Sequence, residues 1–89
     1  MARTRRAEIE VIAHILHAAK NQLGPTRLMY KANLSWKGLN TKLDLLDDEG
    51  LIQRDDRRRV TTTIKGIEFL KAYKQLYRVL NREPYLEAL

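Results

Sequence analysis

The sequence predicts one mainly helical domain, in which three helices precede a two-stranded β-hairpin and a longer last helix. Apolar residues recur every three to four positions in residues 9–23, 39–46 and 67–80, as they do on helices with one buried face. A turn of about three residues separates the second and third helices, which is the helix-turn-helix spacing. After Gly50 the helical period is lost, which indicates short strands. With 89 residues, one domain is expected.

The first helix is predicted from a cap at Thr4 to about Gln22, and Gly24-Pro25 ends it. Its apolar stripe consists of Ile9, Ile12, Ile15, Leu16, Ala19 and Leu23. Steps of about 100° per residue place His14 and His17 opposite this stripe, so we expect both to face solvent. The alternative, a metal-binding pair, needs further ligands, and the chain contains no Cys to supply them.

The second helix is predicted over residues 27–32, with Thr26 as its cap. Residues 33–34 then form the turn. Ser35 has the position of an N-cap for the third helix, and Gly50 ends that helix because glycine readily adopts the left-handed conformation.

Residues 51–55 and 59–62 are predicted as two strands that enclose the basic tip Asp56-Arg57-Arg58. Leu51 and Ile52 are the strongest core candidates of this hairpin.

Thr63 is the expected cap of a last helix over residues 64–82, and Pro84 ends it because the residue before a proline disfavours the α region. The domain therefore divides into residues 1–63, the C-terminal helix 64–82 and a tail 83–89.

Composition narrows the class of protein. Seventeen Lys and Arg against eleven Asp and Glu give a net charge of +6. Residues 1–42 carry a net +6, residues 43–60 carry −2, and residues 61–89 carry +2. A clustered positive charge is expected for a polyanion partner, although it also suits a basic protein without one. A small core without disulfides favours oligomerisation.

The third helix separates into two faces. Leu39, Leu43 and Leu46 share the inward face, and the outward face begins with groups that suit a DNA major groove. These candidate DNA-binding residues are Ser35, Trp36, Lys37, Asn40 and Thr41. Trp36 either contacts a thymine methyl group or a sugar, or packs over the edge of the core.

The second half of the same face is acidic, with Asp44, Asp47, Asp48 and Glu49. DNA would tolerate these charges if the helix enters the groove by its N-terminal end. The alternative is an ordinary solvated helix face.

The hairpin tip carries Arg57, Arg58 and Arg59, with Arg54 nearby. Arginine binds phosphate and fits narrow minor grooves, so these residues are candidate DNA contacts. The alternative is that the charges only protect an exposed sheet edge from aggregation. Further candidates for backbone contacts are Arg27, Lys31, Arg3, Arg5 and Arg6.

The last helix has a wide apolar arc. Phe69, Tyr73, Leu76 and Leu80 follow the 4-3-4 spacing of a coiled-coil seam, with Tyr77 beside them. We therefore predict a homodimer through this helix. The alternative is that the helix folds back across the first helix of its own chain.

The sequence shows no Cys, no His in an acid-base setting, no glycine-rich phosphate loop and no nucleophile motif. We therefore expect no enzyme, no cofactor and no metal. Neither a membrane span nor a signal peptide is recognisable, so a cytoplasmic, nucleoid-associated protein is expected.

Three segments carry a family resemblance: TRLMYKANLS at residues 26–35, LDDEGLI at 46–52 and TIKGIEFL at 63–70. Together they resemble the archaeal winged-helix DNA-binding family typified by the small ten-kilodalton chromatin-type proteins, over about residues 6–80. The resemblance implies a winged helix-turn-helix and an antiparallel coiled-coil dimer through the C-terminal helix. It also implies recognition by residues 35–42 and a wing tip at residues 57–59.

Together, these inferences predict a dimeric protein that contacts double-stranded DNA with its third helix and wing, as a transcriptional regulator or a nucleoid-associated protein. The alternative is a winged-helix protein-interaction module without DNA binding.

Overall fold

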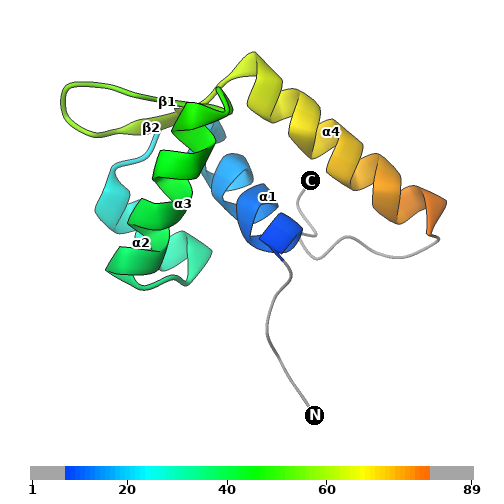
Figure 1. Cartoon of the computed structure of the whole chain (residues 1–89), viewed down its shortest axis with the longest axis horizontal. Coiled ribbons are helices and arrows are strands. Elements are labelled where there is room, and N and C mark those ends of the chain that lie inside the picture. The colour runs from blue at the N-terminus through cyan, green and yellow to red at the C-terminus, as the bar shows by residue number, and fades with distance from the viewer. Residues whose placement is uncertain (1–7, 81–89) are drawn as a thin grey trace, which may run out of the picture.

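The structure, a computed structural model, describes residues 8–80 and has the predicted order of elements (Figure 1). Helices α1, α2 and α3 are followed by the hairpin β1–β2 and by α4. Figure 1 shows α2, α3 and the hairpin on one side of α1 and α4 on the other side. The elements are α1 (Glu8–Ala18), the 3₁₀ turn η1 (Ala19–Asn21), α2 (Pro25–Ala32), α3 (Trp36–Asp48), β1 (Ile52–Arg54), β2 (Val60–Thr62) and α4 (Ile64–Val79).

Helix α1 ends earlier than the apolar period predicts. The α-helix stops at Ala18 and tightens into η1, and Gln22 then adopts a left-handed φ of 41°. Leu23 leaves the helical path because its backbone pairs with Val60 of β2, with N···O distances of 3.0 and 2.7 Å. The end of the predicted stripe therefore joins the sheet. The predicted cap Thr4 lies outside the described residues.

The start of α2 is also different from the prediction. Gly24, not Thr26, is the N-cap, and Thr26 lies inside the helix. Pro25 occupies the first helical position because its fixed φ suits that position and its missing N–H has no partner to lose there. At the other end, Asn33 closes the helix with a left-handed φ of 55°.

Two of the four predicted side-chain caps, Ser35 and Thr63, are confirmed. Ser35 Oγ accepts a hydrogen bond from the Gly38 N–H at 3.0 Å, and Thr63 Oγ1 accepts one from the Gly66 N–H at 3.1 Å. Gly50 has a φ of 76°, a conformation that glycine adopts without steric cost, directly after the end of α3.

The hairpin is shorter than predicted, with three residues in each strand. Ile52 is opposite Thr62 and Arg54 is opposite Val60 in an antiparallel register. Thr62 Oγ1 also donates to the carbonyl of Leu16 at 2.6 Å, which ties β2 to α1.

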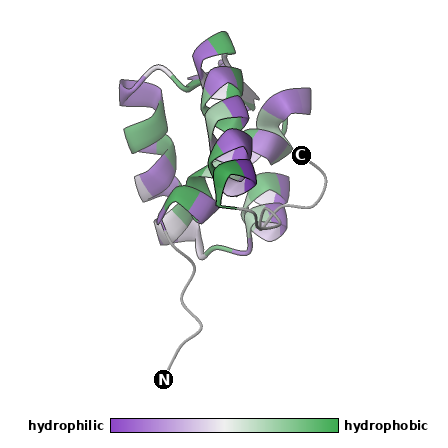
Figure 2. Ribbon diagram, turned by 90° about the vertical axis from the view of Figure 1, so that its right-hand side faces the viewer, coloured by the Kyte–Doolittle hydropathy of each residue, from purple (hydrophilic) through white to green (hydrophobic). Residues whose placement is uncertain are grey.

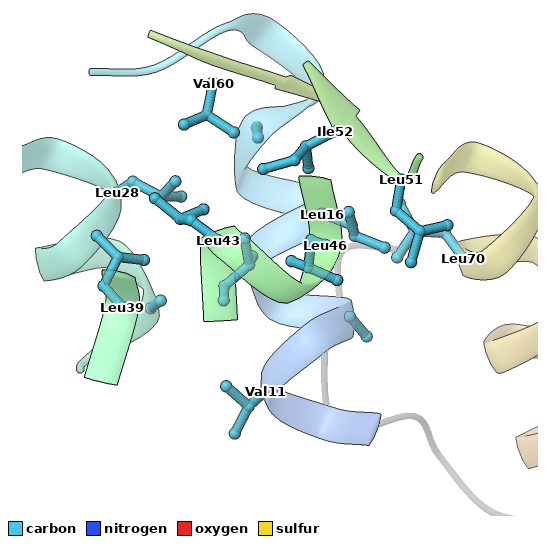
Figure 3. Close-up of a cluster of buried hydrophobic side chains, with 14 of the residues drawn as sticks. Val11, Leu16, Leu28, Leu39, Leu43, Leu46, Leu51, Ile52, Val60 and Leu70 are labelled. Carbon is cyan, nitrogen blue, oxygen red and sulfur yellow. The ribbon is translucent and has the colours of Figure 1, made fainter. Parts of the chain in front are cut away.

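The core lies between α1, α2, α3, the root of the hairpin and the start of α4 (Figure 3). Leu39, Leu43 and Leu46 of α3 point into it, as predicted, and so do Leu51 and Ile52. Figure 2 shows hydrophobic and hydrophilic residues alternating around the helices, as expected of elements with one buried side. Among residues 8–80, no helix combines the length and the apolar composition needed to cross a membrane.

Helix α4 packs against α1, which supports the fold-back alternative for its first half. Leu70 and Tyr73 are buried there, and the Tyr73 hydroxyl donates to the carboxylate of Glu10 at 2.5 Å. The first turn of α4 lies so close to the backbone at Leu51 that position 66 requires glycine. A Cβ there would collide with the Leu51 carbonyl oxygen. Helix α4 ends at Val79 with Leu80 as its C-cap, earlier than the predicted end at residue 82, and residues 81 and 82 lie outside the described residues.

Candidate nucleic-acid interface

The N-terminal half of α3 presents the polar face that the sequence predicts. Lys37 and Thr41 are exposed, while the apolar side of the same helix is buried. Thr41 Oγ1 donates to the Lys37 carbonyl at 3.0 Å, so its hydroxyl oxygen still faces solvent as an acceptor. With Ser35 as cap, the first turn offers backbone N–H groups and one cation to an anionic partner.

Trp36 and Asn40 lie where α3 faces the hairpin. Both line a hollow of about 390 Å³ whose other walls include Pro25, Leu43 and Arg58. Trp36 is 47% exposed, so one part of its ring contacts this wall and the other part faces solvent. Asn40 Nδ2 donates to the Trp36 carbonyl at 2.9 Å, which leaves the amide oxygen for an outside partner.

The acidic half of α3 has a partner that the sequence reading missed. Arg54 of β1 donates from Nε and Nη2 to Asp47 Oδ2 at 3.0 and 2.8 Å, and from Nη2 to Asp44 Oδ1 at 3.3 Å. The hydrogen bond to Asp47 is the main cause that raises the pKa of Arg54. Arg54 therefore joins the hairpin to α3 and does not belong to a free cationic cluster.

One carboxylate organises the wing tip. Asp55 Oδ1 accepts the backbone N–H groups of Arg57 and Arg59, each at 2.9 Å, and Oδ2 accepts Arg59 Nε at 2.8 Å. The hydrogen bond from the Arg59 N–H is the largest cause that lowers the pKa of Asp55. Between these two residues, Arg58 turns the chain with a left-handed φ of 65°.

The predicted cations fall into two groups. Arg54 and Arg59 pair with carboxylates, and Lys42 pairs with Glu8 at 2.6 Å. The other group is exposed and forms no ion pair with any residue between 8 and 80: Arg27, Lys31, Lys37, Arg57 and Arg58. All five lie on α2, the start of α3 or the wing, on the side of α1 away from α4 (Figure 1).

Lys31 is separated from the wing and faces another part of the surface. It lines a hollow at the end of α1 with His14 and His17. The candidate contacts Arg3, Arg5 and Arg6 lie outside the described residues.

The two histidines are half-buried, and the expectation that they face solvent is wrong. They lie beside α2 and the Leu23 segment, which cover this side of α1. Burial, and secondly the charge of Lys20, lowers the pKa of His17. Within the described part of the chain, no group of three His, Cys, Asp or Glu residues could hold a metal ion.

The proposed seam on α4 is only partly accessible. Tyr73 is 1% exposed and offers no surface to a partner, because Glu10 and α1 cover it. Phe69 and Tyr77 are half-buried, whereas Leu76 and Leu80 are 44% and 51% exposed. Val79, which the sequence reading did not single out, is 71% exposed.

Spacing along the chain indicates one of the two unpredicted contacts but not the other. Asp44 and Asp47 stand three apart and therefore share one helix face, which a strand arginine could meet. Glu10 had no such signal, because its partner Tyr73 is far away in the sequence.

A helix-turn-helix followed by a two-stranded wing defines a winged-helix architecture. Residues 5–81 match the winged helix-turn-helix family, and the chain belongs to this family. The resemblance that the three sequence segments indicated is thereby confirmed.

Two relatives are uncharacterized proteins of Methanocaldococcus jannaschii. MJ0287 is 31% identical over 83 residues, which span 92% of this chain and 84% of that protein. MJ0290 is 35% identical over 77 residues, which span 85% of this chain but only 36% of that longer protein.

Two solved structures have the same fold. Sso10a-2, a DNA-binding protein from Sulfolobus solfataricus, superposes with a TM-score of 0.72 at 23% identity over 85% of this chain and 83% of that chain. A MarR-family transcriptional regulator from Silicibacter pomeroyi has a TM-score of 0.58 at 23% identity, over 81% of this chain and 57% of that chain.

Proposed function

We propose that this winged-helix chain binds double-stranded DNA with the N-terminal half of α3 and the wing, and dimerises through α4. The observation that carries the proposal is the distribution of unpaired cations. Arg27, Lys37, Arg57 and Arg58 are exposed without ion pairs among residues 8–80. Such residues neutralise phosphates at little cost, because no internal ion pair has to break.

The proposed contacts divide into phosphate contacts, which fix the protein on the duplex, and base contacts, which read the DNA sequence. Arg27 and the wing arginines bind phosphates, with Lys31 at the margin, because charged groups at these places fix the protein on the duplex. Lys37 and Thr41 face the bases, since they lie on the exposed side of the first turns of α3. Asn40 contributes its amide oxygen and its second amide N–H, because only one N–H is bonded to the Trp36 carbonyl.

Two structural neighbours support a DNA partner. Sso10a-2 is a DNA-binding protein, and the Silicibacter pomeroyi protein is a transcriptional regulator. A transcriptional regulator and a nucleoid-associated protein both use these contacts, and they differ in how strongly binding depends on sequence.

Fluorescence anisotropy with a random duplex and with genomic fragments, at about 50 to 200 mM salt, tests the DNA proposal. Binding that falls steeply with salt and hardly differs among fragments indicates a nucleoid-associated role. A few fragments retained at high salt indicate a regulator. No binding at low salt would refute the proposal and favour a protein-interaction module.

The dimer proposal rests on the apolar residues that α4 leaves exposed. Leu76 and Val79 in its last turn and Leu80 at its C-cap are exposed, whereas Tyr77 between them still packs against the core. A second copy would remove this apolar surface from water.

Sedimentation at several concentrations tests the dimer. Leu76→Glu with Leu80→Glu should convert a dimer to a monomer without loss of helix content, and Lys71→Glu on the same helix is the control. An unchanged mass for the double variant would place the interface elsewhere. Tyr73 is not a suitable target, since a charge there would disrupt the monomer core.

A further inference from the structure

The Arg54 contacts form a clasp between the wing and α3. We use this name for Arg54 with Asp44 and Asp47, whose closest N···O distances are 3.3 and 2.8 Å. Two guanidinium nitrogens meet the Asp47 carboxylate and one also meets Asp44, so the arginine holds both acids at once. The side chain of Arg54 is 30% exposed and those of Asp47 and Asp44 are 43% and 72% exposed, so the clasp lies on the surface.

Beyond its root, the hairpin is joined to α3 by the Arg54 contacts. Its root is held by Ile52 and Val60, which are buried, and by the backbone pairing with Leu23. From residue 53 to residue 59 no side chain is buried. A two-stranded hairpin of this length is marginally stable by itself, so its direction depends on what ties it to the next element.

The clasp lies beside the surface that the cations form. Arg54 and Arg58 line the same hollow as Trp36 and Asn40 of α3. The direction of the hairpin therefore sets where Arg58 stands relative to the first turns of α3.

We propose that Asp44 and Asp47 are positioning residues, which hold the wing through Arg54 so that Arg58 and the start of α3 can contact one DNA duplex together. This inference rests on the proposed DNA function. It accounts for two of the four acids at the end of α3, Asp44 and Asp47, because their side chains contact Arg54.

A purely electrostatic role of the two acids and a positioning role predict different contributions of Arg58 to DNA affinity. If the acids act only through their charge, Asp44→Asn with Asp47→Asn strengthens DNA binding, and Arg58 contributes as much as before. If the acids position the wing, Arg58 contributes less in this variant, because the wing no longer holds it in place. The matched control is Asp48→Asn with Glu49→Gln, which removes two charges from the end of the same helix without touching the clasp.

A double-mutant cycle measures this coupling. The loss of DNA affinity caused by Arg58→Gln is determined in the wild type, in the clasp variant and in the control variant. We expect the loss to be at least about threefold smaller in the clasp variant than in the wild type, and unchanged in the control. Equal losses in all three backgrounds, or equal reductions in both variants, would overturn the proposal.

Amide hydrogen exchange gives a readout that needs no DNA. The Asp55 N–H donates to the Arg59 carbonyl at 3.1 Å across the outer hairpin. Loss of the clasp should speed its exchange by about three- to fivefold, and the control variant should match the wild type. Unchanged exchange in the clasp variant refutes the clasp whatever the protein binds. Faster exchange with no DNA binding by the wild type retains the clasp as a wing support and refutes the DNA proposal.

Discussion

The salt dependence of DNA binding can be worked out from the ion pairs. The proposal assigns four cations to the duplex: Arg27, Lys37, Arg57 and Arg58. None of them forms an ion pair with a residue between 8 and 80. If each neutralises one phosphate, log K falls against log salt with a slope of about −3.6 per protomer. Affinity per protomer then drops roughly 150-fold between about 50 and 200 mM salt, and a dimer doubles the slope to about −7.

One substitution tests this reasoning. Arg58→Gln should reduce the magnitude of the slope by about 0.9 per protomer, because one phosphate contact is lost. The matched control is Lys74→Gln, which removes the same charge from exposed α4 on the other side of the domain. Its slope should equal that of the wild type.

Anisotropy titrations at four or more salt concentrations give these slopes. Equal reductions for Arg58→Gln and Lys74→Gln would show that only the net charge matters. That result would refute the assignment of the interface to α3 and the wing.

Three further predictions concern stability and pH. Tyr73→Phe removes the hydroxyl that donates to the buried Glu10 carboxylate, and should lower the free energy of unfolding by about 2 kcal/mol. Calorimetry should show this as a fall of about 8 to 16 °C in Tm, and a fall under about 3 °C would contradict the prediction. Gly66→Ala should lower the free energy of unfolding in urea by about 2 to 3 kcal/mol, because the added Cβ would collide with backbone. The control is Gly24→Ala, which has open space around it and should lower this free energy by about 0.5 kcal/mol. Similar losses for the two variants would show that crowding is not the cause. Hydrogen bonds hold the pKa of Asp55 below 3.8, so its support of the wing is complete above that pH and is lost as the pH falls through the lower pKa of the folded state. NMR titration of the wing amides should show a midpoint at this lower pKa. A midpoint above 3.8 would argue against the hydrogen bonds.

Local chemistry determined much of this protein from the sequence. Ser35 and Thr63 cap their helices because a hydroxyl can reach an N–H three residues along the chain, in any tertiary context. Leu39, Leu43 and Leu46 share a face because the helical period places them together. The order of helices, turn and wing follows from such short-range rules.

Only the tertiary structure decided which charges and apolar groups remain free. Arg54 pairs with Asp47, and Tyr73 bonds to Glu10, because packing brings separate elements together. Spacing places Asp44 and Asp47 on one helix face, but it does not specify Arg54 as their partner. Tyr73 thereby leaves the predicted seam for the core, and Arg54 leaves the predicted cationic cluster for the clasp. Helical spacing gives the face of a residue, but what covers that face depends on the other elements.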